Sequence, residues 1–145
     1  MSKTGDRAQE LFNELGYSCS EAVFIALAEA DGLSQEEIDA GNKYAGPFCG
    51  GMGSASVCGA LSGGIMTFGR YFGRAMGEER NPDMSNYSEA LFSRFVDEFG
   101  TPDCSALKNE PDYKEQCSNY VRFVVDAVND LLDNGLYGDD DDDCG

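Results

Sequence analysis

Apolar residues recur every three or four positions along most of this chain, and glycine closes most of the runs. This spacing puts the apolar side chains on one face of a helix, whereas no stretch alternates convincingly with the period of two typical of a half-buried strand. The 145 residues are enough for one domain that buries about two-thirds of the surface of the unfolded chain. We therefore predict an all-α, single-domain bundle of about five to seven helices.

Helix start signals accompany two of these runs. Ser18 with Glu21, and Ser34 with Glu37, have the spacing of a capping box. Gly41 is expected to loosen the end of the third helix. The expected helices are residues 4–15, 18–31, 34–41, 57–72, 87–99 and 111–135, with a helical turn that starts at 103.

A glycine-rich loop is expected before the helix at 57–72. Residues 45–54 contain too much glycine and proline for a regular element. Charged residues are absent from Cys49 to Gly69, so we expect the helix that follows to be central and covered on most sides. Gly59 and Gly63 lie one turn apart on this helix, where they would let another backbone, or a cofactor, come close.

The formal net charge of −17 argues against binding to DNA, RNA or an anionic membrane, because each would be repelled. No apolar run approaches the roughly 20 residues of a membrane span. None follows the start Met-Ser-Lys-Thr-Gly-Asp, so we expect no secretory signal and a cytoplasmic location. Five aspartates, at 139–143, indicate that residues 136–145 form an acidic, disordered tail after a domain at 1–135.

The sequence contains six cysteines and no histidine. The lack of histidine excludes Ser-His and Cys-His catalytic pairs as well as zinc or haem ligated by histidine. Without a secretory signal, the cysteines fit metal binding or redox chemistry better than a disulfide framework. No Cys-x-x-Cys pair is present, so the thioredoxin-like and zinc-ribbon signatures are both missing.

Four of the cysteines fall at or near expected helix starts: Cys19, Cys58, Cys104 and Cys117. Unpaired backbone N–H groups and the helix dipole favour the thiolate there, which is the form that binds metal or attacks a disulfide. Taken singly, each could equally be a small buried hydrophobe. Cys49, in the glycine-rich loop, could join or replace a ligand, and Cys144, in the tail, could make an intermolecular link.

Three segments and two later cysteines carry a resemblance to a known family. The segments are Tyr17-Ser-Cys-Ser-Glu-Ala-Val23, Gly50-Gly-Met-Gly53 and Val57-Cys-Gly-Ala-Leu-Ser-Gly-Gly-Ile-Met66, followed by Cys104 and Cys117. In this order they resemble the C_GCAxxG_C_C family of small redox proteins, over nearly the whole chain. The resemblance implies a redox-active domain with four characteristic cysteines, to which Cys49 and Cys144 are additions.

A similar domain occurs in split-Soret cytochromes, beside haem and an iron–sulfur centre. This chain has no Cys-x-x-Cys-His motif, so the haem function does not carry over. By position, the four characteristic cysteines are Cys19, Cys58, Cys104 and Cys117.

Three functions remain open at this point. The first is electron transfer by an iron–sulfur cluster, [2Fe–2S] or [4Fe–4S], held by the four thiolates, with Cys49, Gly59 and Gly63 beside it. The second is thiol–disulfide exchange without metal. The third is a structural Cys₄ zinc site or an interaction module, although zinc ligands usually come as close pairs. We expect a redox partner protein, a small thiol or another electron donor as partner, and a homodimer is plausible.

Overall fold

The computed structural model describes residues 2–136, which form seven α-helices and confirm the all-α prediction. The helices are α1 (Lys3–Asn13), α2 (Cys19–Ala30), α3 (Gln35–Ala45), α4 (Gly59–Phe72), α5 (Asp83–Phe99), α6 (Cys104–Leu107) and α7 (Lys114–Asn134). The β pairing among these residues is a single antiparallel bridge between Val57 and Asp103. The acidic tail expected at 136–145 and Cys144 lie, apart from residue 136, outside the described residues.

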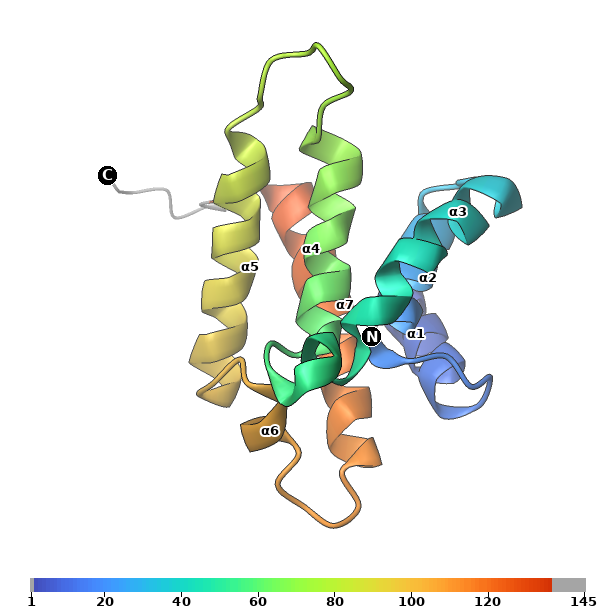
Figure 1. Cartoon of the computed structure of the whole chain (residues 1–145), viewed down its shortest axis with the longest axis vertical. Coiled ribbons are helices and arrows are strands. Elements are labelled where there is room, and N and C mark those ends of the chain that lie inside the picture. Colours follow the sequence, from blue (N-terminus) through green and yellow to red (C-terminus); the bar gives the residue numbers. More distant parts are fainter. Residues whose placement is uncertain (1, 137–145) are drawn as a thin grey trace.

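Helix α4 lies at the centre and packs against α2, α5 and α7, as Figure 1 shows. Leu61 and Phe68 of α4 are fully buried, so the prediction of a central, covered helix is confirmed. In α2, every residue from Ala22 to Ala28 is buried, since α1, α3, α4 and α7 all pack around this short apolar helix. Within residues 2–136 no helix combines the length and the hydropathy of a membrane span.

Both capping boxes form, at the start of α2 and at the start of α3. The prediction that Gly41 loosens α3 is wrong, because α3 continues to Ala45. A Cβ on Gly41 would clash with Cζ of Phe24, so this glycine makes room for a ring of α2. Helix α5 begins at Asp83, earlier than expected, and α7 begins at Lys114, later than Pro111.

The expected loop between α3 and α4 contains a left-handed turn. After the 3₁₀ turn at Gly46–Phe48, Gly50, Gly51, Met52 and Gly53 take φ values of 64°, 65°, 62° and 70°. Glycine adopts this conformation readily, whereas Met52 pays about 1–2 kcal/mol for it. In Figure 1 this loop, α6 and the first turns of α7 lie together at one end of the bundle, opposite the connection at 73–82.

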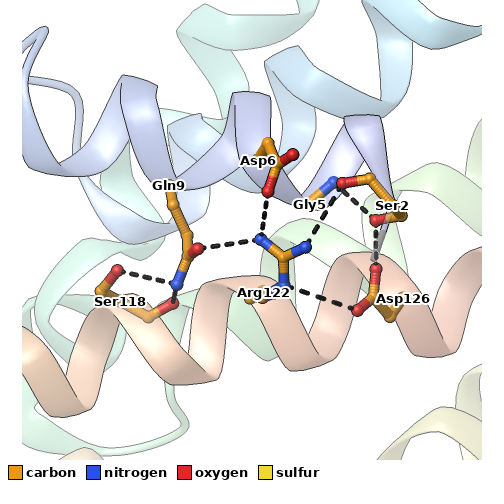
Figure 2. Close-up of polar contacts among 7 residues, drawn as sticks. All are labelled: Ser2, Gly5, Asp6, Gln9, Ser118, Arg122 and Asp126. Carbon is orange, nitrogen blue, oxygen red and sulfur yellow. Dashed lines mark hydrogen bonds and ion pairs between the residues drawn. The ribbon is translucent and has the colours of Figure 1, made fainter.

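The side chain of Arg122, on α7, binds the N-terminal helix α1 through hydrogen bonds and an ion pair (Figure 2). Its Nη1 donates to Asp6 Oδ1 at 2.8 Å and to Gln9 Oε1 at 2.9 Å, both on α1. The hydroxyl of Ser2, which caps α1, donates to Asp126 Oδ1 on α7 at 2.6 Å. These contacts fix α1 along α7.

Candidate functional site

Four cysteines from four separate parts of the chain line one small, partly open cavity of about 20 Å³, called the cysteine cavity below. Its lining residues are Cys19, Gly50, Cys58, Gly59, Cys104, Leu107, Lys108, Cys117 and Tyr120. Cys19 and Cys104 are the first residues of α2 and α6, Cys58 precedes α4, and Cys117 lies in the first turn of α7. The cavity therefore forms where four helices begin.

A short stretch of backbone pairing sets two of these cysteines side by side. Cys58 N–H donates to Pro102 O at 2.8 Å, and Cys104 N–H donates to Ser56 O, on either side of the Val57–Asp103 bridge. A hydrogen bond from the Tyr120 hydroxyl to Leu107 O, 2.8 Å long, ties α6 to α7. These links connect α4, α6 and α7 at the cavity.

The two glycines selected from the sequence have different surroundings. A Cβ on Gly59 would lie 2.5 Å from Cys19 Sγ, so only glycine lets this sulfur approach the start of α4. A Cβ on Gly63 would lie 2.6 Å from Ser20 O, so this glycine lets α4 pack closely against the backbone of α2. Gly59 lines the cavity, whereas Gly63 serves the packing of the helices.

Burial decides the ionisation of the cavity thiols. It raises the pKa of Cys58 to about 12 and that of Cys117 to about 11, although the Lys108 ammonium lowers the latter. Burial also raises the pKa of Cys19, against the opposing effect of backbone N–H groups of Gly50 and Ser20 that donate to its sulfur. The prediction that helix starts favour thiolates is thus wrong for these three cysteines in the metal-free protein, because loss of water outweighs the local dipoles.

Cys49 lies beside the cavity and is not among its lining residues. It is half-buried, and a Cβ on Gly59 would lie 3.3 Å from its Cα, close to the point that Cys19 Sγ approaches. All five cysteines of the described chain are free thiols. Cys49 is therefore a neighbour of Cys19, on the loop side of Gly59.

The donor set of the cavity suits soft metals. Four thiols line it, and thiolates are the ligands of iron–sulfur clusters and of many zinc sites. Among residues 2–136, no three or more cysteine, aspartate or glutamate side chains stand in an arrangement that could hold a metal ion. The volume of about 20 Å³ is close to that of one water molecule. The donors thus fit a cluster or a single ion, and either requires the thiols to reorient.

Lys108 is a cavity residue that the sequence reasoning missed. It is half-buried at the end of α6. A signal was present, because Lys108 and Lys114 are the cations between Cys104 and Cys117 in a chain with a net charge of −17. Only the fold distinguishes between them, since Lys108 alone of the two lines the cavity.

The chain is similar to known proteins over a range that contains the whole site. A family model described as "Putative redox-active protein (C_GCAxxG_C_C)" matches residues 17–131. An "Uncharacterized protein" of Archaeoglobus fulgidus is 37% identical over 140 residues, which cover 87% of this chain and 91% of that protein. No solved structure matches the chain. The matched range includes every residue that lines the cysteine cavity.

Proposed function

The chain belongs to the C_GCAxxG_C_C family of redox-active proteins, and on this premise we propose that it transfers electrons through an iron–sulfur cluster held in the cysteine cavity. The ligands are the four cavity cysteines: Cys19, Cys58, Cys104 and Cys117. One observation carries the proposal: these thiols, spread over about a hundred residues, meet at one small cavity. Their scatter over four helix starts also differs from the close ligand pairs of structural zinc sites.

A bound cluster supplies one-electron chemistry, and the chain supplies its ligands and its surroundings. The three most buried cavity cysteines are at most 9% exposed, so the protein keeps water from their sulfurs. N–H groups of Gly50 and Ser20 point to Cys19 Sγ, and those of Ala60 and Leu61 to Cys58 Sγ. Such N–H groups stabilise negative charge on sulfur.

Metal binding must release protons in this site. Because burial keeps Cys19, Cys58 and Cys117 protonated at neutral pH, each gives up its proton when it becomes a ligand. The same burial disfavours thiol–disulfide exchange as the main activity, since attack on a disulfide needs an accessible thiolate. We therefore place exchange without metal behind the cluster.

The volume of the cavity favours a second candidate, a single tetrahedral ion such as zinc. Space for about one water suits one ion between four sulfurs, whereas a cluster of several iron and sulfide atoms needs the cavity to widen. Gly50, in the loop before α4, lines the cavity, and a Cβ on this glycine would have nothing within 4 Å. We propose that this loop moves outward when a cluster binds and so widens the cavity.

Metal and sulfide analysis of anaerobically prepared protein separates these functions. The cluster predicts visible absorption, iron and acid-labile sulfide in the natural protein and their loss when any one cavity cysteine is replaced by serine. Cys49→Ser is the matched control and is expected to keep both. Zinc at one per chain without iron selects the second candidate. Colourless, metal-free protein whose thiol count changes with reductant would sink both metal sites and select thiol–disulfide exchange.

A further inference from the structure

Lys108 stands out among the residues around the cysteine cavity. Of the residues that line this cavity in the described chain, it alone carries a formal charge at neutral pH. Burial lowers the pKa of Lys108, but the attraction of Cys104, Cys117 and other neighbours outweighs this effect and raises it. In return, Lys108 lowers the pKa of Cys117. Because Lys108 lines the cavity together with the four cysteines, its ammonium group attracts a cavity sulfur whenever that sulfur is ionised.

Contacts of both the backbone and the side chain hold Lys108 in place. The backbone N–H of Lys108 donates to Cys104 O at 3.1 Å, which closes the single turn of α6. Its Nζ lies 4.6 Å from the centre of the Tyr113 ring, at the distance of a cation–π contact. The Tyr120–Leu107 hydrogen bond anchors the preceding residue. These contacts keep a positive charge beside the cavity thiols.

We propose that Lys108 is a specificity-determining residue of the cysteine cavity, whose ammonium favours anionic thiol reagents and the reduced, more negative state of a bound metal centre. The first part concerns the metal-free protein. The second rests on the proposed function, because an electron taken from an external reductant adds one negative charge to a site already rich in thiolates. A unit charge about 10 Å away, at an effective dielectric constant of about 20, changes an equilibrium by roughly tenfold.

The first arm of the test needs no metal. At alkaline pH the small deprotonated fraction of the cavity thiols, first of all that of the half-buried Cys19, attacks the S–S bond of an aromatic disulfide slowly. A mixed disulfide forms, and the aromatic thiolate leaves with the electron pair. Dithiobis(nitrobenzoate) is dianionic and dithiodipyridine is neutral, so the ratio of their rates reports the charge of the site, and changes in thiol pKa cancel. A background with Cys49→Ser and Cys144→Ser confines the reaction to the four cavity cysteines.

Three substitutions in that background decide the result. Lys108→Met is expected to lower the anionic-to-neutral rate ratio by about tenfold, and Lys108→Arg to keep it. Lys114→Met is the control, because it too removes a charge held over an aromatic ring, with Nζ 5.9 Å from the centre of the Phe12 ring, but away from the cavity lining. An unchanged ratio in Lys108→Met, or an equal fall in Lys114→Met, overturns the proposal.

The second arm measures the midpoint potential of the iron-loaded protein by a visible redox titration with dithionite. Lys108→Met is expected to shift the potential downward, so that the reduced-to-oxidised ratio at a fixed applied potential falls by about tenfold, while Lys108→Arg and Lys114→Met match the natural protein. An unshifted potential in a protein that binds iron contradicts the proposal. If no iron binds, the proposed function fails, and the rate ratio alone still decides the role of Lys108.

Discussion

Replacing Gly59 by alanine adds one methyl group where the structure leaves no room for it. The new Cβ would lie 2.5 Å from Cys19 Sγ, 2.9 Å from Phe48 O and 3.3 Å from Cys49 Cα. The sulfur can rotate away, but the two backbone atoms cannot move without shifting the loop before α4. The substitution therefore disturbs the packing at the start of α4 and also the wall of the cysteine cavity.

The magnitude follows from two opposing effects. Overpacking of this kind costs about 1–3 kcal/mol, and replacing glycine by alanine in a helix returns up to about 1 kcal/mol. We expect Gly59→Ala to lower the free energy of unfolding by about 1–2 kcal/mol. Gly69→Ala on the same helix has nothing within 4 Å of the new Cβ, so it should raise the free energy of unfolding by about 0.5–1 kcal/mol.

Gly63→Ala is the second control, because its Cβ would lie 2.6 Å from Ser20 O, outside the cavity lining. Urea unfolding of the metal-free variants measures stability, and anaerobic reconstitution of the folded variants measures bound iron and sulfide. Gly59→Ala should lower both stability and iron content, whereas Gly63→Ala should lower stability alone. If Gly59→Ala matches Gly69→Ala in both assays, the close approach of Cys19 to α4 is refuted.

Three further predictions concern the metal-free protein and are measured by urea unfolding. Folding raises the pKa of Cys58 from 9.0 to about 12. The contribution of this thiol to the free energy of unfolding is therefore complete below pH 9 and is lost as the pH rises through about 12, a fall of about 4 kcal/mol. A free energy of unfolding that does not change over this pH range would contradict the prediction. Arg122→Met should lower the free energy of unfolding by about 2–3 kcal/mol, because the side chain of Arg122 is only 18% exposed. Arg94→Met should lower it by under about 1 kcal/mol, because the side chain of Arg94 is 36% exposed. Equal losses in the two variants would argue against the anchoring of α1 by Arg122. Met52→Gly should stabilise by about 1 kcal/mol by relieving a φ of 62°, and lower stability would show that Met52 is not strained.

The helices were accessible from the sequence because their signals are local. Apolar spacing and the capping boxes at Ser18 and Ser34 depend on a few neighbouring residues, and the structure confirms both boxes. Gly41 was misread, because a glycine that ends a helix and a glycine that admits a neighbouring ring look alike in one dimension. The partner that distinguishes them, Phe24, lies on another helix.

The candidate site also has features that the sequence predicts and features that only the fold shows. Cys19, Cys58, Cys104 and Cys117 could be selected from their places near helix starts and from the family pattern, and the structure brings them to one cavity. Their ionisation could not be predicted, since the helix dipole is a local effect whereas the loss of water depends on the tertiary fold. Lys108 was missed for the same reason, because only the packing of α6 on α7 brings its side chain to the cavity.

The central claim is that the cysteine cavity holds iron through sulfur alone. X-ray absorption at the iron edge of anaerobically reconstituted protein measures this most directly. We predict a first coordination sphere of sulfur only and a second iron atom nearby, both retained in Cys49→Ser and lost in Cys58→Ser. Nitrogen or oxygen ligands, or a spectrum unaffected by Cys58→Ser, would contradict the account.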